Sequence, residues 1–172
     1  MEHNNVLPWH IVEKQINQEI NWLDSIIIDS DTVHNKGFHC KKCILRRIAI
    51  LIISGKVKVK EIKSSGFLWG KNKFVKSEKA HGSQWHHSMM DKIESYFRLK
   101  NYTITIEPYL TQGRADLGIY KENERDLFVE VGSISLNKFL INLESMEGCD
   151  FLLVLSDKHV IEFSILKKGY LN

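Results

Sequence analysis

The feature that most constrains the fold is the stretch from residue 112 to 138, where two short apolar runs each contain one acidic residue. Asp116 lies in ADLGIY and Glu130 lies in LFVEVG, at positions where a strand would normally carry an apolar side chain. Burying an isolated carboxylate is costly unless it is paired or binds a metal ion. Two such residues on neighbouring strands therefore need an explanation that covers both.

The two runs are predicted to form an antiparallel hairpin. Both alternate with the period of two that is typical of strands, and residues 121–125 form a loop of ordinary hairpin length. If Tyr120 pairs with Asp126, Asp116 lies opposite Glu130. Directly opposed side chains start roughly 5 Å apart, so the two carboxylates could bind one divalent cation. A shift of one residue would move one acid to the other face of the sheet.

The composition is typical of a folded protein that does not enter a membrane. A length of 172 residues fits one domain, or a compact domain with an extension. No uncharged apolar run is long enough to span a bilayer, and MEHNNVLPWH has neither the basic region nor the apolar core of a signal peptide. We therefore expect a cytoplasmic protein with no membrane contact. Three cysteines are too few for an all-cysteine iron–sulfur cluster, and disulfides are not expected in a reducing compartment.

The net charge of +3 conceals a strong asymmetry. Residues 36–79 contain thirteen lysines and arginines but only two acids, whereas the rest of the chain contains eleven basic and nineteen acidic residues. A basic block beside an acidic remainder suggests a surface that binds a polyanion next to an acidic pocket. A solvated lysine-rich surface is the alternative. We expect nucleic acid to be the partner.

Five residues of the basic block are predicted to contact nucleic acid. In SGKVKVKEIK, lysines alternate with valines, as in a strand with one lysine-covered face, and Lys56 and Lys58 belong to that face. In the segment that follows, Trp69 lies close to Lys71 and Lys73, and such a mixture of aromatic and cationic side chains suits base stacking and phosphate contact. Alternatively, the aromatic side chains anchor the loop to the core.

Two helices are predicted ahead of this block. Residues 8–28 carry an apolar stripe at helical spacing that suits either the core or a homodimer interface. The apolar run 44–53 is predicted to be a buried helix, with a strand as the alternative. Just before it, His39, Cys40 and Cys43 contain the Cys-x2-Cys spacing of half a Zn²⁺ site. A small buried cysteine pair at a helix start is the interpretation we favour over zinc.

The second half of the chain alternates between strand and helix patterns. A helix is predicted to begin at Ser83, which can act as its N-cap, and Asn101 is a plausible left-handed residue at its end. An all-apolar run such as FLLVLS is typical of a buried central strand. Around the central hairpin, the predicted elements are a helix at 83–100, a strand at 102–107, a helix at 135–147, the buried strand at 151–156 and an outer strand from 159.

This order of elements, with the two acids on its second and third strands, resembles the PD-(D/E)XK nuclease superfamily, which includes restriction enzymes and Holliday-junction resolvases. The resemblance covers roughly residues 83 to 165. It implies a mixed α/β fold with an αβββαβ restriction-endonuclease-like core at residues 81–172. Residues 1–80 would then form a helical and basic N-terminal extension.

The resemblance also implies a function and its residues. Asp116 in GRAD and Glu130 in VEVG match the two acids of the family motif, and with the carbonyl of Val131 they would bind Mg²⁺ or Mn²⁺. Gly132 replaces the motif lysine. In several branches of the family the following helix supplies this lysine instead, and Lys138 fits that role, with an ordinary surface lysine as the alternative. The implied activity is metal-dependent hydrolysis of phosphodiester bonds, in DNA rather than RNA.

Further ligands are expected from the preceding elements. By the same resemblance, Glu94, Glu107 and His87 are candidate metal ligands, and Arg114 beside Asp116 is a candidate phosphate contact. Two alternative functions remain open. One is a nucleic-acid-binding protein that kept the fold and lost the chemistry, which the glycine at position 132 favours. The other is a zinc-dependent nucleic-acid-binding regulator.

Overall fold

The computed structural model describes residues 8–26, 40–63, 83–156 and 159–167. Helices and strands alternate through these segments in the order expected for a mixed α/β protein. The elements are α1 (Trp9–Ile26), α2 (Lys41–Ile53), β1 (Val57–Lys63), α3 (Gln84–Arg98), β2 (Thr103–Ile106), β3 (Leu117–Tyr120), β4 (Leu127–Val131), α4 (Leu136–Ser145), β5 (Asp150–Ser156) and β6 (His159–Ile165).

The strands form one six-stranded mixed sheet in the order β1-β6-β5-β4-β3-β2. β4 and β5 are parallel, because α4 carries the chain back from the end of β4 to the start of β5, and all other pairs are antiparallel. β5 is central and almost entirely buried, as its apolar sequence predicts. The prediction that β6 is an outer strand was wrong, because β1 pairs along seven residues with the side of β6 that faces away from β5.

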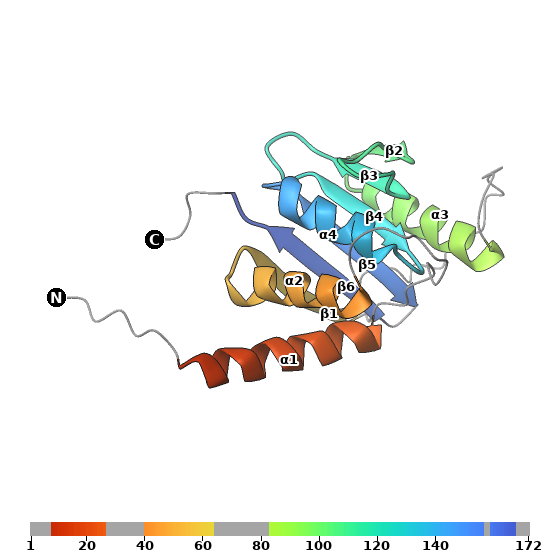
Figure 1. The fold of residues 1–172 in the computed structure, drawn as a ribbon. Helices are drawn as coiled ribbons and strands as arrows, with labels where there is room; N and C mark the ends of the chain where they lie inside the picture. Colours follow the sequence, from red (N-terminus) through yellow and green to blue (C-terminus); the bar gives the residue numbers. More distant parts are fainter. Residues whose placement is uncertain (1–7, 27–39, 64–82, 157–158, 168–172) are drawn as a thin grey trace.

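The sheet is covered by helices on both faces (Figure 1). α1, α2 and α4 pack against one face, and α3 packs against the other. Neighbouring residues of β4 show this division, since Phe128 is buried with the first group of helices and Val129 with α3. By the alternation of strand side chains, Glu130 shares the face of Phe128 and points towards α4.

The predicted hairpin register is confirmed. Leu117 pairs with Val129 and Ile119 pairs with Leu127. Extending this register by one residue places Asp116 opposite Glu130, at the end of the sheet where β4 finishes. The predicted ends of α3 are also present, because Ser83 is the N-cap and accepts a hydrogen bond from the backbone N–H of His86.

β1 belongs to the same sheet as the later strands, and α1 and α2 pack into the same hydrophobic core as the later elements. The apolar stripe of α1 is buried, together with α2 and α4, in the larger of the two core clusters. Val57, the first residue of β1, is buried in that cluster, and its neighbours Lys56 and Lys58 are exposed. The predicted boundary at residue 80 lies outside the described residues. Within the described ranges, no helix combines the length and the apolar character that crossing a membrane requires.

Candidate functional site

Asp116 lies just before the first residue of β3, and its carboxylate is held by the neighbouring strand. Its Oδ2 accepts a hydrogen bond of 2.6 Å from the backbone N–H of Val131, the last residue of β4. The backbone of Asp116 also bonds to β4, donating its N–H to the carbonyl of Val129 at 3.0 Å. The carboxylate is therefore fixed at the end of the hairpin, with a quarter of its side chain exposed (25%).

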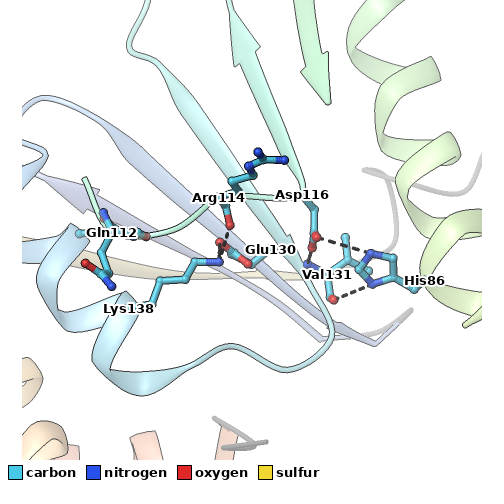
Figure 2. A network of polar contacts seen from close by, with 8 residues as sticks. His86, Gln112, Arg114, Asp116, Glu130, Val131 and Lys138 are labelled. Carbon is cyan, nitrogen blue, oxygen red and sulfur yellow. Dashed lines mark hydrogen bonds and ion pairs between the residues drawn. The ribbon is translucent and has the colours of Figure 1, made fainter. Parts of the chain in front are cut away.

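His86, in the first turn of α3, contacts both Val131 and Asp116 (Figure 2). Its Nδ1 lies 3.0 Å from the carbonyl oxygen of Val131, and its Nε2 lies 3.5 Å from Oδ1 of Asp116. A carbonyl can only accept, so Nδ1 carries a hydrogen and donates it. The ring thus connects α3 to both strands, and when protonated it forms an ion pair with Asp116.

His87 was the histidine predicted as a metal ligand, and the structure places its neighbour His86 against Asp116. His87 lies beside it, with the two ring centroids 5.9 Å apart. The sequence contains a signal for this choice. His86 is four residues before Met90 and seven before Ile93, and both of these are buried against the sheet.

Glu130 is buried, with only 6% of its side chain exposed, and Lys138 reaches it from the first turn of α4. The Nζ of Lys138 lies 2.7 Å from Oε1 of Glu130 and donates a hydrogen bond of 2.5 Å to the carbonyl of Arg114. Figure 2 shows the lysine side chain extended along the loop towards both partners. The prediction that Lys138 lies at the start of this helix is confirmed, and its ammonium group points at the second acid.

The two carboxyl groups resist ionisation. Burial raises the pKa of Glu130 to about 7, the charge of Asp116 adds to this rise, and Lys138 opposes it. Burial also raises the pKa of Asp116 above its ordinary value, against the lowering effects of the Val131 N–H, His86 and Lys138. Carboxyl groups with raised pKa values are concentrated at functional sites, which makes Asp116 and Glu130 the candidate centre.

The path of Lys138 depends on a glycine in the loop before β3. Gly113 has a positive φ of 73°, and a Cβ added to it would lie 3.2 Å from Cδ of Lys138. The same loop is clamped by the buried amide of Asn142, one turn further along α4. Asn142 accepts the backbone N–H of Gln112 at 2.8 Å and donates to its carbonyl at 3.0 Å. Lys138 and Asn142 lie four residues apart on α4, and both side chains therefore fix the position of this loop.

The glycine at position 132, directly after β4, is explained by its backbone conformation. Its φ is +88°, in the left-handed region that side chains of L-residues rarely adopt. A Cβ at position 132 would point towards the ring of Trp85 on α3, 3.8 Å away. The β4 side chains that face α4 are those of even-numbered residues within the strand, and Gly132 lies just beyond it. A lysine at position 132 would therefore be strained.

The donor atoms present suit a hard divalent cation. The buried Oε1 of Glu130 has the ammonium of Lys138 as its ion-pair partner at 2.7 Å and no further partner among the described residues. Carboxylate and carbonyl oxygens are the ligands that Mg²⁺ prefers, and it typically binds through one or two carboxylates while keeping several waters. Within the described ranges, no group of three or more His, Cys, Asp or Glu side chains is arranged to hold a metal ion.

Two of the other predicted ligands are paired elsewhere. Glu107 has a positive φ of 48° and pairs with Arg114 at 3.2 Å, while its backbone N–H bonds to the carbonyl of Asp116. Arg114 also stacks on the ring of Tyr109, with its guanidinium carbon 4.2 Å from the ring centroid. Glu94 pairs with Arg98 at 2.8 Å along α3. Arg114 and Glu107 thus border the site through backbone contacts, and their side chains form an exposed pair beside it.

The remaining predicted residues lie away from the two acids. Lys58 is on β1 and Lys56 directly precedes that strand, which is separated from β4 by β6 and β5. Cys40 and Cys43 are at the start of α2, and the interpretation of a buried cysteine pair was wrong because both are exposed. The other predicted residues lie outside the described part of the chain: His39, Trp69, Lys71 and Lys73.

Comparisons of the chain with models of protein families, with curated proteins and with solved structures found no match.

Proposed function

We propose that this chain is a divalent-metal-dependent nuclease that hydrolyses phosphodiester bonds of nucleic acid, DNA in preference to RNA. The observation that carries the proposal is the meeting of Asp116, Glu130 and Lys138 at one end of the sheet. Two carboxylates with raised pKa values lie on paired strands, and a lysine from the next helix points at one of them. A buried arrangement of this kind destabilises the fold unless a bound cation compensates for it.

The order of elements gives the proposal a second support. From α3 to β5 the chain runs helix, three antiparallel strands, helix and parallel strand. This is the order of the αβββαβ restriction-endonuclease-like core, and we propose that the chain has that core. Asp116 lies directly before its second strand and Glu130 near the end of its third strand, which supports the match to the two acids of the superfamily motif.

Asp116, Glu130 and the carbonyl oxygen of Val131 would hold Mg²⁺ or Mn²⁺. Such a cation lowers the pKa of a bound water and neutralises charge on a phosphate. The chain itself contributes orientation and charge. The N–H of Val131 fixes one oxygen of Asp116, and His86 fixes the carbonyl of Val131. The ammonium of Lys138, desolvated beside Glu130, is placed to stabilise negative charge that develops on the phosphate.

The flanking nucleic acid would be held by positive charge outside this centre. Arg114 is half exposed at the rim of the site, and Lys56 and Lys58 are exposed at the start of the edge strand β1. Contacts of this type bind the phosphate backbone by releasing counterions, independently of sequence, so affinity should fall steeply with added salt. Lys56 and Lys58 can also protect the edge of the sheet from pairing with another chain.

A test of this function is the role of Lys138. Lys138→Met should lower the rate of Mn²⁺-dependent cleavage of an oligonucleotide about a hundredfold, the range expected for one group that stabilises transition-state charge. Gly113→Ala should lower the rate in the same direction, because the new methyl group would meet the lysine side chain at 3.2 Å. Single-turnover cleavage with saturating protein gives the rates.

Gly55→Ala is the matched control for the second variant. Gly55 has the same positive φ of 73°, but a Cβ there would meet no atom within 4 Å. Both alanine variants should lose about 1–2 kcal/mol of stability from backbone strain. Equal cleavage rates in Gly113→Ala and Gly55→Ala would contradict the proposed path of Lys138, and full activity of Lys138→Met would remove the lysine from the mechanism.

A second function is favoured by the pairing of the donor atoms. Glu130 already faces an ammonium group, and the carbonyl of Val131 already accepts from His86. These contacts suit a protein that keeps the fold and binds nucleic acid without cutting it. Calorimetry separates the two: the binding protein would give no heat with Mn²⁺ and would cut nothing, while still binding an oligonucleotide in gel-shift assays.

A further inference from the structure

Cys40 and Cys43 form an exposed pair of thiols at the start of α2, here called the cysteine pair. Their sulfur atoms lie 2.7 Å apart. Two thiolates bound to one tetrahedral Zn²⁺ would be separated by about 3.8 Å, given the usual Zn–S bond length of ~2.3 Å. The observed separation is shorter than this, so the two sulfur atoms are close enough for one to attack the other.

The helix start gives the two thiols different characters. Cys40 is the N-cap of α2, and its Sγ accepts a hydrogen bond of 3.3 Å from the backbone N–H of Cys43. Hydrogen bonds from the thiol and the N–H of Cys43 lower the pKa of Cys40, whereas the contact with Cys40 and burial raise the pKa of Cys43. A thiolate at the positive end of a helix is stabilised, so Cys40 is the nucleophile.

The surroundings of this nucleophile are exposed to solvent and positively charged. Lys41 and Lys42 follow Cys40 directly and are exposed, and Lys41 pairs with Asp24 of α1 at 2.7 Å. α2 itself is tied to α4 through Arg47 and Glu144, 2.6 Å apart. The helix start is therefore held in place while its thiols react, and its charge suits an anionic reactant.

We propose that the cysteine pair is a thiol–disulfide exchange site that reacts with small anionic disulfides of the oxidised-glutathione type, with Cys40 attacking and Cys43 resolving. The inference is independent of the proposed nuclease activity, because neither cysteine touches Asp116 or Glu130 in the contacts described above.

The exchange balances without any further reactant. The Cys40 thiolate attacks one sulfur of the disulfide, forms a mixed disulfide, and releases the first half of the reagent as a thiol. Cys43 then loses its proton and attacks the Cys40 sulfur, which releases the second half as a thiol. The two cysteines lose two electrons and two protons in forming their bond, and the small disulfide gains both.

The test uses the reduced full-length chain with oxidised glutathione as the probe. The titratable thiols should fall from three per chain to one, and peptide mapping should find a bond between Cys40 and Cys43. Cys43→Ser should stop at one glutathione per chain, attached to Cys40, and Cys149→Ser should leave the exchange unchanged. At pH 7, iodoacetamide should modify Cys40 about tenfold faster than Cys149, whose pKa is raised by burial.

Three results would overturn the proposal. The first is retention of all three thiols after exposure to oxidised glutathione. The second is equal alkylation rates at Cys40 and Cys149. The third is one zinc per chain in the purified protein that protects the cysteine pair from both reagents and is lost in Cys40→Ser, which would assign the pair to a metal site.

Discussion

Glu130→Gln is expected to abolish divalent-dependent cleavage while leaving the fold intact. The amide has the size of the carboxyl group but carries no charge, so it removes one of the two anionic ligands proposed for the cation. Loss of a metal-binding carboxylate should lower the single-turnover rate by about a thousandfold or more, on the order of 4 kcal/mol of transition-state stabilisation. Asp116→Asn should have an effect of similar size.

Two controls make this result specific. Glu122→Gln removes the same charge from an exposed position in the β3–β4 loop and should retain the wild-type rate. Binding of an oligonucleotide by Glu130→Gln in EDTA should match that of the wild type, because the basic residues are unchanged. Cleavage that survives both Glu130→Gln and Asp116→Asn would show that the chemistry occurs elsewhere.

The free energy of unfolding of the metal-free protein should fall as the pH rises from about 5 to 8. The pKa of Glu130 is about 7 in the folded protein, against an ordinary value of 4.5, so the folded state holds its proton more tightly than the unfolded state. Stability from this group is present below pH 4.5 and is lost as the pH rises through 7. The loss amounts to about 3 kcal/mol, since each pKa unit corresponds to roughly 1.4 kcal/mol.

Urea denaturation of wild type and Glu130→Gln in EDTA checks this directly. The difference between the two free energies should change by about 3 kcal/mol across the interval, with the variant relatively more stable at pH 8. Glu122→Gln should follow the wild type. Added Mn²⁺ should stabilise the wild type more at pH 8 than at pH 5, because the cation binds the ionised carboxylate. A difference that does not change with pH would contradict the raised pKa of the buried Glu130 carboxyl group.

The parts of the site that could be predicted were those fixed by local pattern. Alternation with a period of two sets which face each residue of β3 and β4 occupies, and the loop length sets the register, so Asp116 opposite Glu130 followed from the sequence. Lys138 was predicted from the resemblance, because several branches of that superfamily take the lysine from the helix that follows the second acid, and the structure brings its ammonium group to Glu130.

His86 was missed for a reason of helix phase. A stripe drawn at a strict spacing of four through Trp85 and Met89 drifts around the helix, because four residues turn it by about 400° rather than 360°. The buried positions include Met90 as well as Met89, while Trp85 is 38% exposed. The true stripe therefore passes through His86, which lies towards the sheet.

Long-range pairing was also beyond the sequence. β1 joins β6 about a hundred residues later in the chain, and nothing in either strand's pattern identifies the other as its partner. The clamp between Asn142 and Gln112 is similar, because a lone polar residue on an apolar helix face does not reveal which backbone it will bond. Exposure of the cysteine pair depends on the packing of α2, which local pattern leaves undetermined.

The central claim is tested most directly by incubating the wild-type protein with linear duplex, branched and single-stranded DNA and with RNA, in Mn²⁺, in Mg²⁺ and in EDTA. We expect cleavage of at least one DNA substrate with either cation and none in EDTA. Intact substrates under every condition, or cleavage that continues in EDTA, would contradict it.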